Sequence, residues 1–399
     1  MMLRIALYAE VDPNLVEGPA IWLAAVAEML SRGGCDVTVL LRAPRQRDEV
    51  LSAIDGAPGI AVVEPLALGA ASGGRQLSAR RAVRLLAELD TAAKFDGVIL
   101  RGRRTAREAA ADPVFRGRLA FYLTDLPRLP PGSGWFRRAD LARTLRCASL
   151  LLSQTPEIAD CLKQQFSLPE GVATALLPPI ADDRAFGLAP ARAPAPGEVL
   201  RLAYVGKFAP AWNTVEMAAL PALLARHGCR AELHVAGNKF IPHSYPRFAR
   251  RMRTALANPG VRWTGGLPRL DALRLAASCH VGLSWRAPQL DGSLELSSKL
   301  IDYGAVGLPA ICNPTPMHRR LLGEDYPLFA ATASEVTAAV LRAAADPAVW
   351  GAARAAVHNL AIRHRASTIG AELTATLAAV FGDGMPGQAT PAAGTGRAA

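Results

Sequence analysis

Residues 3–41 read LRIALYAEVDPNLVEGPAIWLAAVAEMLSRGGCDVTVLL, and this stretch decides the class of fold. Residues 3–8 are apolar and typical of a strand. Apolar periodicity then predicts a helix over residues 20–31, and after a Gly-Gly turn a second strand is predicted over residues 36–41. A strand, a helix and a strand with short connections predict two parallel strands joined by a right-handed crossover.

The same alternation continues through the first half of the chain. Short apolar runs bounded by turn residues predict strands, and longer amphipathic runs between them predict helices. This order indicates a doubly wound α/β sheet. The predicted strands cover residues 59–63, 97–100, 120–123 and 149–152, and the predicted helices cover residues 80–93, 140–146 and 155–165.

Residues 187–198 read GLAPARAPAPGE, a proline density that neither helix nor strand tolerates, so a linker is predicted there. The α/β pattern then restarts and predicts a second domain. We expect domains over residues 1–186 and 199–365, a helix over residues 366–382, and a disordered tail over residues 383–399. Strands are predicted at 200–205, 231–236, 261–263, 281–284 and 309–312, and helices at 215–227, 245–257, 270–279, 297–306, 333–345 and 367–381.

Composition agrees with a two-domain globular protein and excludes several classes of site. The chain has 399 residues, of which 51% are hydrophobic and 20% charged, and a single core rarely extends past about 300 residues. Six cysteines are scattered without zinc spacing and are interpreted as buried apolar residues. No DxD-type carboxylate pair in a suitable loop suggests a metal, so no metal or other cofactor is expected. All seven histidines lie from His227 onward, which excludes a histidine base from the first half. Without a spanning segment or a leader peptide, we expect a cytoplasmic protein.

The net charge of +11 is concentrated locally. Residues 101–146 hold eleven arginines against four acidic residues, a pattern that attracts phosphate, anionic lipid or nucleic acid, although it also describes an ordinary solvated surface. Within it, residues 135–146 combine Trp135 and Phe136 with four arginines. We expect this stretch either to contact the inner face of an anionic membrane or simply to pack on its own domain. A nucleic-acid partner is not expected, because aromatic residues are only 6% of the chain.

Residues 294–311, LELSSKLIDYGAVGLPAI, carry the most informative chemistry. They predict a helix with Ser297 as the N-cap and Asp302 one turn inside. Free N–H groups at such a helix start can bind a diphosphate, and Asp302 can accept ribose hydroxyls, while Lys299 adds a positive charge. A capped amphipathic helix before a buried strand equally needs no ligand. Together with the loops 9–19 and 206–213, residues 289–299 are expected to line a ligand cleft between the domains.

These residues resemble a known family. SSKLIDYGAVGLPAI resembles the donor-site signature of retaining GT-B glycosyltransferases of the family-4 type, also called glycosyl transferases group 1. The other pieces occur in the order and spacing of that family, and the resemblance covers roughly residues 3–382. The pieces are VEGPAIWLAAVAEMLSRGGCDVTVL, SQTPEIADCL, LLPPIADDRAF, LAYVGKF, LHVAGN and VRWTGGLPRLDALRLAASCHVGLS.

The resemblance implies two facing Rossmann-like domains, an acceptor domain first and a nucleotide-sugar donor domain second, with the last helix returning to the first domain. The activity it implies is transfer of a hexose-type sugar, with retention and without a metal, from a nucleotide-diphosphate sugar to a glycan, lipid-linked or small-molecule acceptor, as in cell-surface polysaccharide biosynthesis. The site residues it implies fall into three groups. They are Lys207, Lys299 and Glu295 for catalysis, Gly206, Lys207, Gly237, Ser297, Ser298 and Asp302 for the donor, and Gly18, Pro19 and Asp125 for the acceptor or phosphate loop.

Several residues depart from the family pattern. Asp302 stands where the second glutamate of the paired motif usually lies, Lys207 replaces an arginine, and Thr124 stands where many members have histidine. Two alternatives therefore remain open. One is a non-hydrolysing nucleotide-sugar epimerase, which would need histidine near the sugar. The other is a catalytically weak GT-B protein that binds anionic partners through its basic surface.

Overall fold

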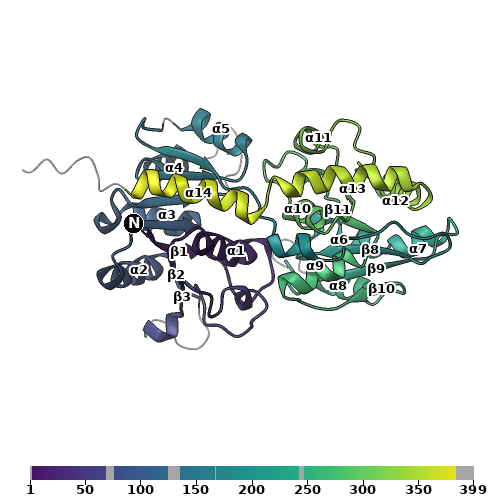
Figure 1. Cartoon of the computed structure of the whole chain (residues 1–399), viewed down its shortest axis with the longest axis horizontal. Coiled ribbons are helices and arrows are strands. Elements are labelled where there is room, and N and C mark those ends of the chain that lie inside the picture. Colours follow the sequence, from purple (N-terminus) through teal and green to yellow (C-terminus); the bar gives the residue numbers. More distant parts are fainter. Residues whose placement is uncertain (1, 69–75, 125–134, 167, 242–246, 383–399) are drawn as a thin grey trace, which may run out of the picture.

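The computed structural model describes residues 2–68, 76–124, 135–166, 168–241 and 247–382. Two parallel β-sheets lie side by side along the long axis of the molecule (Figure 1). The first sheet has seven strands and the second has five, and helices cover both, so the α/β class predicted from the sequence is confirmed. We call the first sheet with its helices the first unit, and the second sheet with its helices the second unit.

The first sheet has the strand order β3-β2-β1-β4-β5-β6-β7, in which every neighbouring pair is parallel. The order reverses between β1 and β4, where the chain switches from one side of the sheet to the other. The strands are β1 (Arg4–Ala9), β2 (Asp36–Leu40), β3 (Ile60–Val63), β4 (Gly97–Arg101), β5 (Leu119–Tyr122), β6 (Leu150–Ser153) and β7 (Ala173–Leu176). The helices between them are α1 (Gly18–Arg32), α2 (Ala79–Ala93), α3 (Arg103–Ala110), α4 (Trp135–Arg146) and α5 (Pro156–Gln165).

The sequence analysis located most of these elements within a few residues but missed α3 and β7. The buried residues of α3 are Thr105, Ala106 and Ala109, so its apolar periodicity is too weak to recognise. The strand β7 lies at the edge of the sheet, and none of its four side chains is fully buried. Both elements are positioned by packing or pairing with neighbouring elements rather than by a strong pattern of their own.

The second sheet has the order β10-β9-β8-β11-β12, again entirely parallel, with its reversal between β8 and β11. Its strands are β8 (Leu200–Val205), β9 (Ala231–Ala236), β10 (Val261–Trp263), β11 (Val281–Ser284) and β12 (Ala310–Cys312). Its helices are α6 (Thr214–Met217), α7 (Leu220–Ala225), α8 (Phe248–Leu256), α9 (Arg269–Ala277), α10 (Ser298–Ala305), α11 (Pro316–Leu322), α12 (Ala333–Ala345) and α13 (Pro347–Ile362).

Two corrections apply to the helices of the second unit. The single helix predicted over residues 215–227 is two short helices, α6 and α7, because Pro221 occupies the first turn of α7 and cannot continue a helix from α6. The helices α11 and α13 were not predicted. Each begins with a proline after a side-chain cap, Thr315 before α11 and Asp346 before α13, which is a common way for a helix to start.

The last helix, α14 (Ala366–Phe381), leaves the second unit and packs on the first, as the sequence analysis expected. In Figure 1 it is the yellow helix that crosses beside α1. Leu373 and Leu377 are buried in the same apolar cluster as α1 and the strands β1 and β4. Close approach is possible because Gly370 has no side chain, since a Cβ there would lie 2.7 Å from Cγ of Met29.

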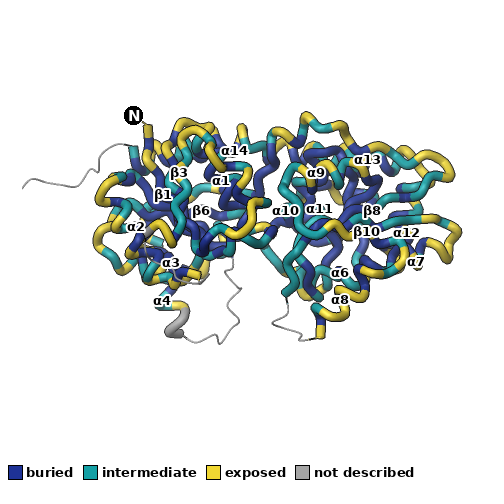
Figure 2. Tube along the Cα trace, turned by 90° about the horizontal axis from the view of Figure 1, so that it is seen from below, coloured by how far each residue is buried: buried dark blue, intermediate teal, exposed yellow. Residues whose placement is uncertain are grey.

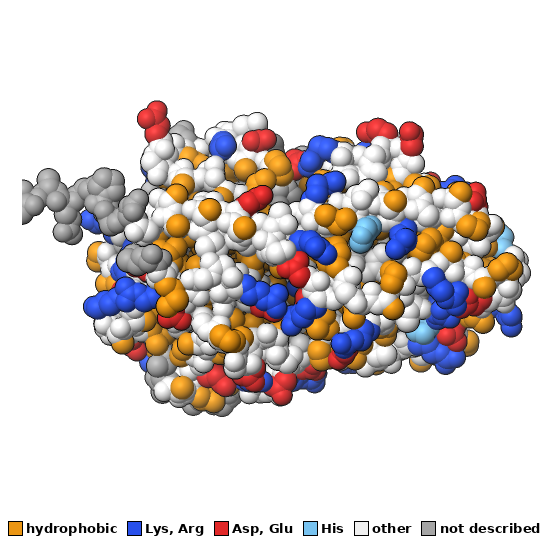
Figure 3. Space-filling model, viewed as in Figure 1, with side chains coloured by type: hydrophobic (Ala, Val, Ile, Leu, Met, Phe, Trp, Pro, Cys, Tyr) orange, Lys and Arg blue, Asp and Glu red, His pale blue; other side chains and the backbone are white. Residues whose placement is uncertain are grey.

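Buried apolar side chains are concentrated along the strands of both sheets, which are the dark blue segments at the centre of each unit in Figure 2. Lys and Arg side chains on the face shown in Figure 3 are spread among apolar and uncharged groups. Among the described residues, no helix is long and apolar enough to cross a membrane.

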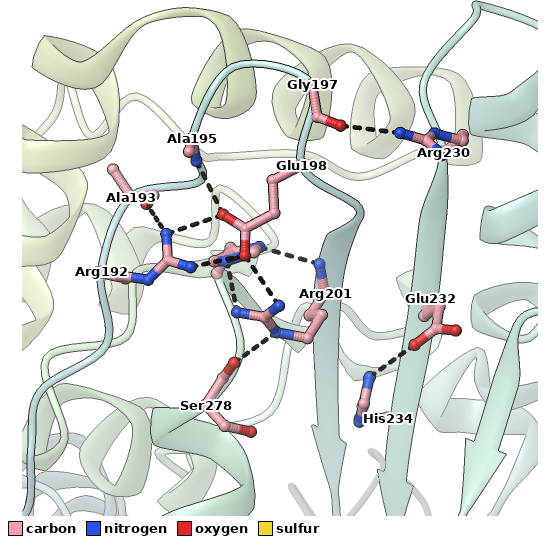
Figure 4. A network of polar contacts seen from close by, with 11 residues as sticks. Arg192, Ala193, Ala195, Gly197, Glu198, Arg201, Arg230, Glu232, His234 and Ser278 are labelled. Carbon is pink, nitrogen blue, oxygen red and sulfur yellow. Dashed lines mark hydrogen bonds and ion pairs between the residues drawn. The ribbon is translucent and has the colours of Figure 1, made fainter.

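The predicted linker contains neither helix nor strand over residues 188–199 and lies between β7 and β8. Ion pairs nevertheless hold it in place (Figure 4). The Glu198 carboxylate accepts hydrogen bonds from both terminal nitrogens of Arg192, at 2.8 and 2.6 Å, and from Arg201 at 3.0 Å. These hydrogen bonds, that from Arg192 above all, lower the pKa of Glu198 to about 2. The linker is therefore attached to the start of β8 rather than loose.

Candidate functional site

The segments that follow strands of the two sheets meet at two places. The first lies between the loop after β1 and the loop after β9. The backbone N–H of Val16 donates to Oδ1 of Asn238 at 3.3 Å, and the Lys239 ammonium forms an ion pair with the buried Glu17 carboxylate. Glu17 is the residue directly before α1. The carboxyl ends of β1 and β9 therefore face each other.

The second place of contact joins the segment after β6 to the segment between β11 and α10. The Thr155 hydroxyl donates to the carbonyl oxygen of Leu294 at 2.9 Å. The backbone N–H of Leu296 donates to Oε1 of Gln154 at 3.0 Å. The carboxyl ends of β6 and β11 therefore also face each other.

Strand order places the remaining carboxyl ends between these two contacts. In the first sheet β4 and β5 lie between β1 and β6, and in the second sheet β8 lies between β9 and β11. The ends of β4, β5 and β8 thus lie in the middle of the boundary between the units. Each sheet also reverses its strand order there, at β1/β4 and at β8/β11, which is where open α/β sheets bind ligands.

Two glycines in the predicted donor site bring the ends of β8 and β9 into contact. Gly206 has φ +147°, a conformation that residues with a side chain rarely adopt. A Cβ on Gly237 would lie 2.0 Å from the carbonyl oxygen of Gly206. Both positions require glycine, because the ends of β8 and β9 pack directly against each other and the Lys299 side chain lies beside Gly206.

Three cationic side chains surround the ring of Trp212, which lies in the loop after β8. Nζ of Lys299 is 4.5 Å from the ring centroid, Nζ of Lys207 is 5.6 Å from it, and Cζ of Arg286 is 5.9 Å from it. We call these three residues the cation cluster. Two of them, Lys207 and Lys299, are predicted catalytic residues that the fold brings together from segments far apart in sequence.

Lys299 is the buried member of the cation cluster. Only 9% of the residue is exposed, and among the described residues its ammonium contacts the rings of Trp212 and Tyr204 but makes no hydrogen bond or ion pair. Burial first, and then the nearby charges of Lys207 and Arg286, lower its pKa to about 7. A bound anion would raise the pKa of Lys299 again, because its negative charge would offset both the burial of the ammonium and the repulsion from Lys207 and Arg286.

Sequence reasoning missed Arg286, which follows β11 by two residues. It is 2% exposed, and its Nε has no hydrogen-bond partner among the described residues. Its backbone is fixed, because its N–H donates to Oδ1 of Asn313 at 2.8 Å and its carbonyl oxygen accepts from Nδ2 of the same residue at 2.8 Å. Burial lowers the pKa of Arg286. The sequence signal that could have identified Arg286 is its position two residues after the buried strand β11.

The helix α10 begins where the sequence predicted, but its cap differs. Ser297 occupies the N-cap position, yet its hydroxyl makes no hydrogen bond to the first turn and instead accepts from the Ser284 hydroxyl at 3.1 Å. Ser298 is the half-buried first residue of the helix. Without a side-chain cap, the N–H groups of the first turn remain available to an anion.

Asp302, the predicted ribose acceptor, already has a partner. Its Oδ1 lies 2.8 Å from a terminal nitrogen of Arg269, which also donates to the carbonyl oxygen of Ile180 at 2.5 Å. The side chains of this pair are 18% and 16% exposed. Arg269 was not singled out from the sequence, and it leaves one oxygen of Asp302 for a ligand.

The remaining predicted residues are less closely grouped. Gly18 and Pro19 form the first turn of α1, with Gly18 exposed next to the Glu17–Lys239 contact. Glu295 is half-buried in the segment before α10, and its charge acts on Arg286. Asp125 lies outside the described residues.

Within the described part of the chain, no group of three His, Cys, Asp or Glu residues could hold a metal ion. Metal independence stays a prediction.

Comparison with known proteins identifies the fold. No protein-family model matches the sequence, and no curated protein matches it either. Solved structures do match. A glycosyltransferase from Rickettsia africae has a TM-score of 0.67 and 12% identity, with 96% of this chain and 100% of that chain covered. A sucrose-phosphate synthase from Thermosynechococcus elongatus has a TM-score of 0.70 and 13% identity, with 96% and 100% covered.

HepE from Anabaena, solved with UDP and glucose, has a TM-score of 0.66 and 13% identity, with 94% of this chain and 100% of that chain covered. Identities this low establish the fold alone. The chain has the GT-B fold, with two Rossmann-like units whose carboxyl edges face each other, as the sequence analysis expected.

Proposed function

We propose that this protein is a glycosyltransferase that transfers a hexose-type sugar from a nucleotide-diphosphate sugar, with retention at the anomeric carbon. The observation that carries the proposal is the cation cluster at the strand-order reversal of the second sheet. Three positive side chains converge there, and among the described residues none of them forms an ion pair. A diphosphate is a ligand with the charge to match them. The GT-B fold supports the proposal, because HepE, which shares it, was solved with UDP and glucose.

The cation cluster would act on the leaving group. As the bond from the anomeric carbon to the diphosphate breaks, negative charge grows on the diphosphate oxygens. Lys207, Lys299 and Arg286 would stabilise that charge, together with the uncapped first turn of α10. Buried cations stabilise such charge more strongly than exposed ones, because little water competes for it. Glu295 lies in the segment before α10, and in this proposal its carboxylate would lie near the transferred sugar.

Asp302 would hold the ribose of the donor through the oxygen that Arg269 does not occupy. In this arrangement Arg269 orients the carboxylate, since the same guanidinium is anchored to the carbonyl oxygen of Ile180 in the chain just before the linker. The ribose site would thus depend on a contact between the two units. Gly18 and Pro19, at the start of α1, would lie on the acceptor side.

The epimerase alternative has less support in the structure. The cation cluster consists of lysine and arginine, and the described ends of β4 and β5 include no histidine, since all seven histidines lie from His227 onward. His318, the histidine bound to the Asn313 carbonyl oxygen, is 0% exposed. Burial lowers its pKa to about 4, so it is neutral and enclosed rather than available to a substrate.

Contact with an anionic membrane is a second part of the proposal. Packing of α3 beside α4 gathers six exposed arginines, while Leu141 and Leu145 are buried in the core of the first unit. Because those two leucines are buried, a contact of this surface with lipid would be electrostatic. The side chains of Trp135, Phe136 and Arg137 lie outside the described residues. The six arginines are Arg103, Arg104, Arg107, Arg138, Arg143 and Arg146.

The donor site is tested by titrating the purified protein with UDP, ADP and GDP and measuring heat and melting temperature. We expect one of them to bind, and Arg286→Met to weaken it about tenfold or more, because a charged hydrogen-bond donor is lost. Arg226→Met is the matched control, since Arg226 is exposed beyond the end of α7. Equal affinity in the wild type and Arg286→Met would contradict the site, and no binding at all would contradict the function.

Salt dependence tests the membrane contact. Wild type should sediment with phosphatidylglycerol vesicles at low salt and be released at high salt. Arg143→Glu/Arg146→Glu should stay in the supernatant at both. Sedimentation that high salt does not reverse would contradict an electrostatic contact.

A further inference from the structure

The first unit contains a cation that the proposed function has not used. Arg101 is the last residue of β4, at the strand-order reversal of the first sheet. Its Cζ lies 4.9 Å from the ring centroid of Trp22 and 5.2 Å from that of Tyr122. The two rings are stacked, with centroids 4.7 Å apart and planes inclined by 8°. We call these three residues the Arg101 platform.

The two rings hold the Arg101 side chain in place, but among the described residues most of its N–H donors have no hydrogen-bond partner. Trp22 is 6% exposed and Tyr122 is 1% exposed, so the rings cannot move aside, while Arg101 itself is half-buried and reachable from solvent. Among the described residues its guanidinium makes one hydrogen bond, a long one from a terminal nitrogen to the Thr124 hydroxyl at 3.5 Å. A guanidinium has five N–H donors, so most of them remain available.

The acidic residues that follow the strand next to Arg101 bind other groups and not its guanidinium. Glu10 follows the neighbouring strand β1, but its Oε1 accepts from the backbone N–H of Thr105 at 2.5 Å, inside the first turn of α3. Glu17 is paired with Lys239 of the second unit. Within the described ranges, Arg101 therefore forms no ion pair. The buried indole N–H of Trp22 is a second donor with no partner in that part of the chain.

The position of Arg101 indicates what would use it. The end of β4 lies between the two contacts that join the units, opposite the end of β8, which bears Lys207. The second unit already offers three cations to a donor diphosphate, so a cation on the opposite edge is not required for the donor. It would instead face the molecule that receives the sugar.

Resting on the proposed function, we propose that the Arg101 platform binds an anionic group of the acceptor, a phosphate or a carboxylate. A guanidinium has a planar edge that can form two parallel hydrogen bonds to the oxygens of such a group, and most N–H donors of Arg101 have no partner among the described residues. The acceptor is then a sugar phosphate, a sugar acid or a lipid phosphate rather than a neutral sugar.

Calorimetry with UDP present throughout, or with ADP or GDP in its place if that is the nucleotide that binds, tests the proposal. The soluble probes are glucose 6-phosphate, glucuronate, glucose and inorganic phosphate, and the membrane probe is phosphatidylcholine vesicles with and without a polyprenyl phosphate. Arg101→Met removes the charge, and Arg101→Lys keeps it without the planar edge. Arg84→Met is the matched control, because Arg84 is exposed on α2.

We expect an anionic probe to bind the wild type, glucose alone to bind at least about tenfold more weakly, and Arg101→Met to lose about tenfold or more in affinity for the anionic probe. Arg101→Lys should recover only part of that loss. Binding of a soluble probe identifies a small anionic acceptor, whereas binding only to polyprenyl phosphate vesicles identifies a lipid phosphate. Affinity for UDP should be unchanged in each variant, and Arg84→Met should behave as wild type.

Two results would overturn the proposal. One is a wild type that binds UDP but no anionic probe, or binds it equally well in Arg101→Met, which would leave Arg101 a packing residue. The other is an equal loss of UDP affinity in Arg101→Met, which would assign Arg101 to the donor. If the wild type binds an anionic probe but no nucleoside diphosphate, the anion site stands and the glycosyltransferase function fails.

Discussion

Replacing Lys299 by methionine should make the protein more stable and less able to bind its donor. Methionine keeps an unbranched apolar stem of similar length but removes the buried ammonium. The pKa of Lys299 is lowered from 10.5 to about 7, mainly by burial, so the folded protein holds this proton weakly compared with the unfolded chain. Folding at neutral pH therefore costs free energy at this position, and the variant avoids that cost.

The magnitude follows from the two pKa values. Between pH 7 and pH 10.5 the unfolded chain binds more protons than the folded one at this site, so the free energy of unfolding of the wild type rises with pH. Compared with a residue that is neutral in both states, Lys299 lowers the free energy of unfolding by about 4 kcal/mol at pH 7 and by about 2 kcal/mol at pH 9. The stability advantage of Lys299→Met should therefore shrink by about half over that range.

Urea unfolding at several pH values measures the stability of Lys299→Met. Calorimetric titration with the nucleoside diphosphate that binds measures its loss of donor affinity. Loss of one charged contact should weaken the diphosphate about tenfold to a hundredfold. Lys163→Met on α5 is the matched control, because Lys163 is exposed and its removal should change stability by less than about 0.5 kcal/mol. A variant that is no more stable than wild type at pH 7, or that binds the diphosphate equally well, would refute this account of Lys299.

Three further predictions concern single groups. Asp302→Ala should weaken nucleoside diphosphate binding about tenfold or more in calorimetry, because ribose hydroxyls lose their acceptor, and unchanged affinity in a folded variant would remove Asp302 from the site. Lys207→Ala should lower kcat more than it weakens diphosphate binding, because its charge matters most when the leaving group is fully formed, whereas equal losses would make it an ordinary contact. Burial lowers the pKa of both His280 and His318 from 6.5 to about 4. The unfolded chain thus binds more protons between those values, and the free energy of unfolding should fall as pH drops from 6.5 to 4, by up to about 3 kcal/mol for each histidine. A stability that is flat across that window in urea unfolding would contradict this.

Local patterns were enough to predict the fold class and much of the donor edge. Alternating strands and helices, with a proline-rich break at residues 187–198, are set by neighbouring residues, so they can be read along the chain. Lys207 and Lys299 were identified because the segments that contain them, LAYVGKF and SSKLIDYGAVGLPAI, resemble donor-site motifs of a known family. The helix α3 was missed because its apolar periodicity is weak, and α11 and α13 were also not predicted.

Only the tertiary structure decided which residues meet. Arg286 depends on Asn313, 27 positions away, and Asp302 on Arg269, 33 positions away. Arg101 joins Trp22 and Tyr122 because parallel pairing brings β4 and β5 together beside α1. Pairing of distant strands, and the direction in which each sheet edge faces, depend on contacts between segments far apart in the chain. Residue order alone therefore indicates which charges are present, while the three-dimensional fold determines which of them lack a partner.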